Sequence, residues 1–184
     1  GDPDPSALSP GMRGIRSFTV VWVLLLTAVA ACDGSIERSG EPATGPAFSH
    51  NISADQSGYY RPLTPVRSGD WTLSHLFMGQ AADFTAWEQA ERTAGLAPVM
   101  LEFETATGAR TRVLPSRYTV TGTLVRFAGW TADLGEVAFE GRLDADALAT
   151  ARRNLGDEGA VVSGTLKVGG RSISGVRLRW WAGD

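Results

Sequence analysis

Apolar and polar residues alternate repeatedly between residues 69 and 181, and this period of two constrains the fold more than any other feature. Alternate side chains of a β-strand point to opposite faces, so each alternating segment predicts a strand with one apolar face. The first group of residues that share a parity is Trp71, Leu73, His75 and Phe77, in which only the histidine is polar. The next two groups are Val99, Leu101 and Phe103, and Val137, Phe139 and Leu143. Strands with a single apolar face are typical of antiparallel sheets that leave their other face in solvent.

Two segments instead show the spacing of an amphipathic helix. In residues 79–95, Phe84 and Trp87 recur at helical spacing, and a helix is expected to run to the glycine that closes the segment. In residues 144–156, Asp144 is a suitable N-cap, and the final glycine is a suitable left-handed stop. The apolar stripe of this second helix comprises Leu148, Ala151 and Leu155.

The predicted fold class is therefore α+β, mainly an antiparallel sheet of about six or seven strands with two helices covering one face. We expect the sheet to be strongly curved, because glycines recur inside the predicted strands. With 184 residues, the chain has room for one domain of this kind.

The last two predicted strands form a hairpin. Gly169 and Gly170 supply a two-residue turn that pairs Leu166 with Ile173 and Gly164 with Gly175. Beyond the second pair the apolar parity of the last strand changes, and a strand without a bulge would expose its later apolar residues. We therefore predict a β-bulge near Ser174–Gly175.

Three glycines, Gly122, Gly141 and Gly164, share the parity of the apolar residues around them. If these faces point inward, each glycine leaves space that a close-packed core must fill. Two interpretations are open: large rings lie over the glycines, or an apolar ligand occupies a cavity lined by the glycines and His75. The available rings are those of Trp71, Phe84, Trp87 and Trp180.

The segment VSGTLKVGG and the strand after it, residues 162–178, resemble the closing hairpin of the YceI-like periplasmic proteins. Members of that family have a lipocalin-like barrel that holds a long isoprenoid. The resemblance implies a carrier or sequestering protein for an apolar, lipid-like ligand.

A leader segment precedes the alternating region. Arg13 and Arg16 come before an uncharged apolar run at residues 18–31 that is about 14 residues long, whereas a membrane-spanning helix needs about 20. A basic flank, a short apolar run and small residues at its end are the parts of a secretory signal. We therefore predict a signal peptide over residues 12–31, after a cloning remainder or translated upstream sequence at residues 1–11.

The sequence VAAC at the end of this run resembles the lipobox of bacterial lipoproteins, where signal peptidase II cuts just before the cysteine. The resemblance implies that the peptidase recognises Val29, Ala30 and Ala31. It also implies a diacylglycerol on the Cys32 sulfur and a further acyl chain, such as palmitate, on its amine. Several acyl chains anchor a protein stably in a membrane.

The expected organisation is thus a lipidated Cys32 with a flexible tether over residues 32–68, followed by a globular domain over residues 69–184. The tether is predicted because this stretch is rich in glycine, serine and proline and has no sustained period. The expected location is the bacterial cell envelope, with the domain facing the periplasm.

Few residues in the chain suit catalysis. Cys32 is the single cysteine, and His50 and His75 are the only histidines, so we predict no metal site and no cofactor. His50 falls in the predicted tether, where a solvated side chain is expected. His75 is the one candidate general base, and a hydrolase using it is an alternative function. Otherwise we expect no catalytic residues and no enzymatic activity.

One surface composition favours a partner. Arg177, Arg179 and Trp181 share the outward face of the last predicted strand, and arginine beside tryptophan is typical of binding hot spots. The net charge of −3 gives no reason to expect a nucleic-acid partner. The sequence therefore predicts a membrane-anchored envelope lipoprotein with a binding or structural role, with an envelope protein as its partner. Carriage of an apolar ligand is the alternative.

Overall fold

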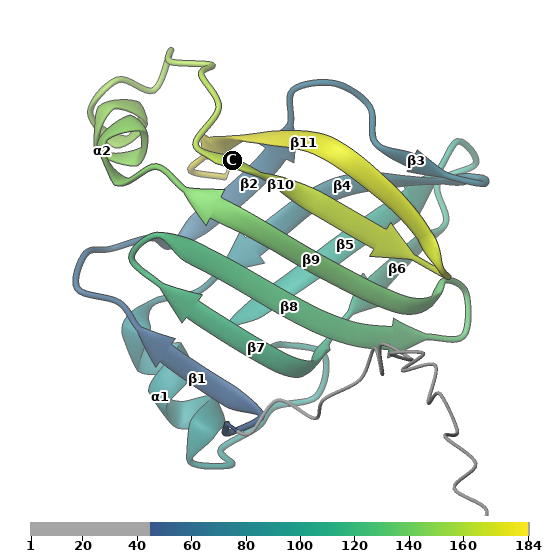
Figure 1. Ribbon diagram of the computed structural model, residues 1–184, viewed down its shortest axis with the longest axis horizontal. Coiled ribbons are helices and arrows are strands. Elements are labelled where there is room, and N and C mark those ends of the chain that lie inside the picture. Colours follow the sequence, from purple (N-terminus) through teal and green to yellow (C-terminus); the bar gives the residue numbers. More distant parts are fainter. Residues whose placement is uncertain (1–44, 184) are drawn as a thin grey trace, which may run out of the picture. The chain divides into compact units, whose positions relative to one another are not determined.

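The alternating segments form one continuous sheet in the computed structural model, which describes residues 45–183 (Figure 1). The strands are β1 (Phe48–Asn51), β2 (Gly58–Pro62), β3 (Arg67–Ser68), β4 (Trp71–Met78), β5 (Val99–Thr105), β6 (Arg110–Val113), β7 (Pro115–Thr121), β8 (Leu124–Thr131), β9 (Gly135–Leu143), β10 (Val162–Val168) and β11 (Arg171–Trp181). The helices are α1 (Ala81–Glu88) and α2 (Ala145–Arg153).

Hydrogen-bonded neighbours in the sheet follow the order β1-β7-β8-β9-β10-β11-β2-β4-β5-β6, and β3 pairs with β4. All the described strand pairs are antiparallel except β1 with β7, which run parallel. The sheet curls into a half-barrel, with β7, β8 and β9 in front and β4, β5 and β6 behind in Figure 1. The α+β class is confirmed, whereas the predicted six or seven strands were too few for this sheet of eleven.

The missed strands lie mainly in the segment predicted to be a tether. β1, β2 and β3 all fall before residue 69, and β2 inserts between β11 and β4 near the middle of the strand order. Tyr60 of β2 is fully buried and pairs with Leu76 on one side and Trp180 on the other. The domain boundary predicted at residue 69 was therefore wrong. The glycine-rich and proline-rich composition indicated a tether, although this segment contains a strand with a buried aromatic residue.

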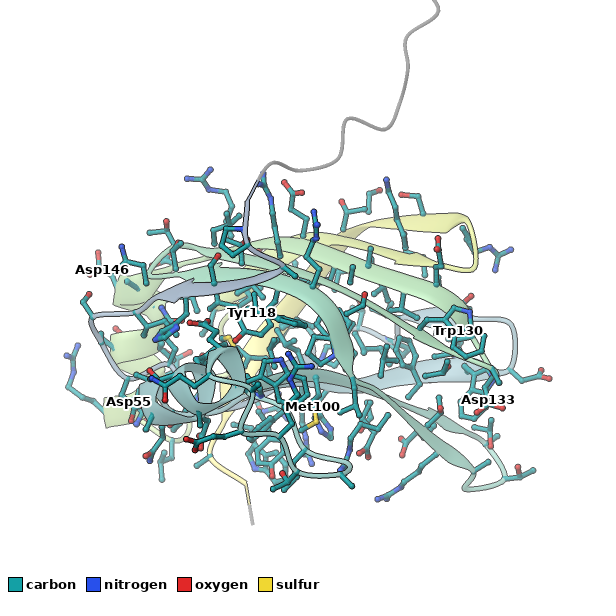
Figure 2. The ribbon with its side chains drawn as sticks, turned by 90° about the horizontal axis from the view of Figure 1, so that it is seen from below. Asp55, Met100, Tyr118, Trp130, Asp133 and Asp146 are labelled. Atoms are coloured by element: carbon teal, nitrogen blue, oxygen red, sulfur yellow. The ribbon has the colours of Figure 1, made fainter. Side chains whose placement is uncertain are left out.

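The concave face of the curled sheet is filled by its own side chains. The largest fully buried side chains on the sheet belong to Tyr60, Tyr118, Phe103, Phe139, Leu76 and Met78. Figure 2 shows Tyr118 between the layers of the sheet and Trp130 near its edge. Burial of large apolar groups on this scale is the main force that stabilises such a domain.

Both helices lie at the left-hand end of the sheet in Figure 1 instead of across one of its faces. The predicted N-cap of α2 is confirmed, since Asp144 accepts a hydrogen bond from the backbone N–H of Ala147. Leu148 is buried as expected, but the third residue of the predicted stripe, Leu155, is 78% exposed because α2 ends at Arg153.

The first helix is also shorter than predicted. It ends at Glu88, well before Gly95, and Ala90 adopts a left-handed backbone with a φ of 63°. This reversal directs the chain away from the helix axis and into the loop that leads to β5.

The predicted hairpin is confirmed. Gly169 and Gly170 form its turn, and Leu166 pairs with Ile173. The predicted pair of Gly164 with Gly175 was wrong, since Gly164 pairs with Val176. The register shifts between these two observed pairs, so that Ser174–Gly175 faces a single residue of β10. Gly175 has a φ of +69°, a conformation that glycine adopts without strain. The bulge restores the inward direction of the later apolar side chains of β11.

Candidate functional site

A second β-bulge, in β4, decides which way His75 points. The register between β4 and β5 shifts between Leu73 and His75. Leu73 and Leu76 are both buried, at 3% and 0% exposure, so the inward parity changes across the bulge. His75 and Phe77 therefore lie on the outer face of the sheet. The prediction that His75 shares the apolar inner face with Trp71 was wrong, because continuous alternation does not reveal an inserted residue.

The bulge places His75 beside a row of outward rings. Trp181 of β11 pairs with Tyr59 of β2, and Tyr59 pairs with Phe77 of β4. The Tyr59 ring centroid lies 5.4 Å from Trp181, 5.3 Å from Phe77 and 5.0 Å from His75. These four rings are half-buried, and together with Arg61 and Arg179 they form what we call the aromatic face.

The arginines on this face make two kinds of contact. The Arg61 guanidinium carbon lies 3.3 Å from the Trp181 ring centroid, and among residues 45–183 no ion pair involves Arg61. Arg179 instead lies 3.1 Å from a Glu158 carboxylate oxygen. Arg177 is exposed on the same face, as the predicted parity of β11 requires.

His75 contacts a serine hydroxyl and lies beside a carboxylate that faces arginines. Its Nδ1 lies 3.1 Å from the Ser74 hydroxyl oxygen, and burial lowers the pKa of its ring, an effect that nearby Glu102 partly offsets. Glu102 pairs with His75 across β4 and β5, but its two carboxylate oxygens face arginines. Oε2 lies 3.1 Å from Arg112, and Oε1 lies 3.9 Å from Arg110.

The three predicted glycines differ in what surrounds them. Gly122 lies in the turn between β7 and β8, with nothing near the position of a Cβ. A Cβ on Gly141 would lie 2.7 Å from the Phe139 ring, and one on Gly164 would overlap the backbone of Glu140. Gly141 and Gly164 nevertheless line one surface hollow of about 520 Å³, whose lining includes neither Gly122 nor His75. A ligand cavity lined by all four residues stays a prediction.

A ring over a glycine does occur elsewhere. A Cβ on Gly58 would overlap the Trp180 indole nitrogen, and Gly58 has a φ of +136°. Among the predicted rings, Trp180 therefore packs on a glycine, but on one at the start of β2.

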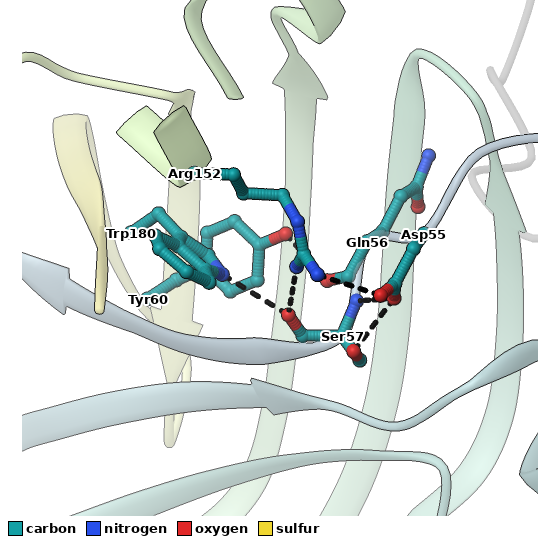
Figure 3. Close-up of polar contacts among 6 residues, drawn as sticks. All are labelled: Asp55, Gln56, Ser57, Tyr60, Arg152 and Trp180. Carbon is teal, nitrogen blue, oxygen red and sulfur yellow. Dashed lines mark hydrogen bonds and ion pairs between the residues drawn. The ribbon is translucent and has the colours of Figure 1, made fainter. Parts of the chain in front are cut away.

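Trp180 belongs to a polar cluster that the sequence did not predict (Figure 3). The backbone carbonyl of Ser57 accepts hydrogen bonds from Trp180 Nε1 at 3.0 Å and from Arg152 Nη1 at 2.9 Å. Arg152 Nη2 also donates to Asp55 Oδ2 at 2.6 Å. The last turn of α2 is thereby fastened to the loop between β1 and β2.

Burial and hydrogen bonding shift two pKa values in this cluster. The hydroxyl and backbone N–H of Ser57 both donate to Asp55 and, with the Arg152 charge, lower the pKa of the Asp55 carboxyl. The Tyr60 hydroxyl donates to the Gln56 carbonyl at 2.6 Å, and burial raises the pKa of the phenol. The cluster is therefore held in one protonation state near neutral pH, as expected of a structural clamp.

His50 lies in a second interior contact and is not solvated. Its Nδ1 is 2.9 Å from a Glu88 carboxylate oxygen, and its ring stacks on Phe84. The Tyr118 hydroxyl donates to the same carboxylate at 3.0 Å. The prediction of a solvated His50 was wrong because residues 48–51 form β1, which contacts α1.

The remaining sequence predictions are untested. The lipobox residues Val29–Cys32 fall outside residues 45–183. Within that described part, no three His, Cys, Asp or Glu side chains are grouped to hold a metal ion. No helix there has the length and apolar character required to span a bilayer.

Comparison with other proteins adds no assignment. No protein-family model matches the chain, and no curated protein or solved structure matches it. The resemblance of residues 162–178 to YceI-like proteins therefore stays a prediction, although those residues do form the hairpin β10–β11.

Proposed function

We propose that this protein is a lipoprotein of the bacterial envelope, anchored through acylated Cys32, whose aromatic face binds an acidic segment of an envelope protein. The anchoring part rests on the leader and on the lipobox resemblance at Val29, Ala30 and Ala31. The binding part rests on the geometry of the outer face of β11, β2 and β4.

The stacking of Arg61 on Trp181 is the observation that carries the binding proposal. The guanidinium carbon lies over the Trp181 ring at 3.3 Å from its centroid, a cation–π contact that holds the side chain in place and leaves its N–H donors available to a ligand. A guanidinium held in this way is suited to a carboxylate, because its planar donor fork matches two carboxylate oxygens. An acidic partner is therefore the best chemical match.

Apolar contacts would supply the rest of the binding energy. Tyr59 and Phe77 extend the ring row beside Trp181, and Arg177 adds an exposed positive charge at its border. Tryptophan, tyrosine and arginine are the residues most enriched among binding hot spots. The favoured partner segment thus presents carboxylates next to an apolar side chain.

Photo-crosslinking in the intact envelope tests this proposal. A photoreactive amino acid at Arg177 should give one defined protein adduct, and the additional change Arg61→Gln should abolish it. The same probe at Lys167, on a different outer face, is the matched control. No adduct at Arg177, or the same adduct from both positions, would contradict a partner-binding aromatic face.

Apolar-ligand carriage remains the alternative, and the structure gives it less support because the Phe139 ring occupies the space beside Gly141. Native mass spectrometry of the purified protein separates the two functions. We expect a mass without bound lipid beyond the acyl anchor; a stoichiometric co-purified isoprenoid or fatty acid would favour the carrier.

A further inference from the structure

The outer face of β7–β10 differs in character from the aromatic face. Arg117 of β7, Ala128 of β8, Ala138 of β9 and Lys167 of β10 are successive cross-strand partners, so they form one row across the sheet. Two small side chains thus lie between two cations. Three strand spacings of about 4.8 Å separate the outer members of the row, or roughly 14 Å.

This row forms the floor of a surface hollow with a volume of about 620 Å³. Besides the row, its lining includes Arg126 and Thr119 and, at one edge, Gly45 and Pro46. The hollow exists because the two alanines leave the space that larger side chains would fill. We call Arg117, Arg126, Lys167 and the alanines between them the cationic face.

Most of the charge on this face is uncompensated. Arg126 pairs with Glu140 at 3.2 Å, whereas no ion pair among residues 45–183 involves Arg117 or Lys167. The chain as a whole has a net charge of −3, so the excess of positive charge is local. A local cationic surface attracts anions even on a protein whose net charge is negative.

An exposed tryptophan lies on the same side of the sheet. Trp130 is 64% exposed and lies two residues beyond Ala128 on β8, so both side chains point outward. Figure 2 shows Trp130 at the periphery of the domain. Indole rings favour the headgroup level of a bilayer, where their apolar body and N–H group are both satisfied.

The chain leads into the hollow from its proposed anchor. Gly45 lines the edge of the hollow, and the 12 residues from 33 to 44 separate it from Cys32. A chain segment of 12 residues spans at most roughly 40 Å. Acylation at Cys32 would therefore keep this face within a short distance of the lipid headgroups.

We propose that the cationic face rests on an anionic lipid bilayer, with Arg117 and Lys167 at lipid phosphates and Trp130 in the headgroup layer. The tether argument rests on the proposed function, whereas the charge and the exposed indole do not depend on it. The aromatic face, on β11, β2 and β4, stays available to a protein partner.

Vesicle binding by the unacylated chain tests the face without the anchor. All described strands, helices and contacts lie within residues 45–183, so a chain beginning at Asp33 keeps them, and circular dichroism checks that it is folded. We expect it to bind vesicles containing phosphatidylglycerol and not vesicles of phosphatidylcholine alone. The double variant Arg117→Gln/Lys167→Gln should weaken binding about 25-fold, since each basic residue contributes about fivefold.

The matched control is Arg67→Gln/Arg110→Gln, which removes two exposed arginines from β3 and β6. It carries the same net charge as the test variant and should bind like the parent chain. Equal weakening by both variants, or no preference for anionic vesicles, would overturn the proposal. A change of oligomeric state in the test variant without a change in vesicle binding would also overturn it, and would indicate a second copy as the occupant.

The full acylated protein provides an independent measurement. A fluorophore attached at Trp130→Cys should be quenched by brominated lipid, and one at Arg67→Cys should not. Similar quenching at both positions would show that the domain has no preferred orientation. That result would contradict the membrane orientation but neither the acylation of Cys32 nor partner binding. Failure of this inference is therefore distinguishable from failure of the proposed function.

Discussion

The aromatic face and the cationic face lie on the outer surface of the same curled sheet, but they are built in opposite ways. On the aromatic face, the Tyr59 ring packs against those of Phe77 and Trp181 at interplanar angles of 53°, and all three rings are half-buried. On the cationic face, Ala128 and Ala138 leave a hollow between charges that are mostly unpaired.

The comparison shows that the burial of a surface side chain decides whether it contributes to stability, to binding or to both. Removing a half-buried ring exposes its neighbours and costs packing energy, whereas removing an exposed side chain costs little. Variants on the aromatic face should therefore affect folding as well as binding. Variants on the cationic face should affect binding alone.

The largest expected effect is on stability. Trp181→Ala removes the ring that contacts Tyr59 and Arg61 and should lower the free energy of unfolding by about 2–3 kcal/mol. Trp130→Ala, at a residue 64% exposed, should change it by less than about 0.5 kcal/mol. Urea denaturation measures both, and equal losses would remove the distinction between the faces.

A smaller loss is expected from Tyr60→Phe. The change deletes the hydroxyl that donates to the Gln56 carbonyl at 2.6 Å and leaves that buried acceptor unpaired, at a cost of about 1–2 kcal/mol. Because Tyr60 belongs to β2, the strand that carries Tyr59, hydrogen exchange should quicken in β2 and β11 and not in β8. Uniform acceleration across the sheet would show that the faces are not separately stabilised.

The pH dependence of stability separates the faces further. The pKa of His75 is below its ordinary value of 6.5 in the folded protein, so the unfolded chain binds more protons between those two pKa values. The contribution of His75 to stability is complete above pH 6.5 and falls as the pH decreases toward its folded pKa. The variant His75→Asn should reduce the change of the denaturation midpoint with pH in this window. Lys167→Gln should leave that pH dependence unchanged.

The smallest stability effects should accompany the clearest binding effects. Arg177→Glu and Lys167→Glu both reverse an exposed charge, and each should change the free energy of unfolding by less than about 0.5 kcal/mol. With the photoreactive amino acid moved to Arg179, Arg177→Glu should abolish the protein adduct and preserve vesicle binding, and Lys167→Glu should do the reverse. If either variant impaired both activities, the two faces would form a single site.

The sequence predicted those features that depend on local chemistry. The N-cap at Asp144 and the bulge at Ser174–Gly175 were predicted correctly, because each has its own signal: a short acidic side chain in one case, a glycine and a change of parity in the other. The position of Trp181 on the outer face followed from the same change of parity.

Features that depend on tertiary packing were missed. The bulge in β4 has no glycine to mark it, so His75 was placed on the wrong face. β1 and β2 are stabilised by neighbours distant in sequence, such as Glu88 and Trp180, and not by their own composition. The cationic face was missed because cross-strand partners such as Arg117 and Lys167 cannot be read from a single strand.

The most direct test of the account is the intact mass of the mature protein extracted from bacterial membranes, because the proposed location of the protein in the envelope rests on Cys32 as the lipid anchor. We predict a chain that begins at Cys32 and carries a diacylglycerol and an additional acyl group, and we predict that Cys32→Ala abolishes this form. A mature chain beginning elsewhere, or one with an unmodified cysteine recovered in the detergent-free fraction, would contradict the account.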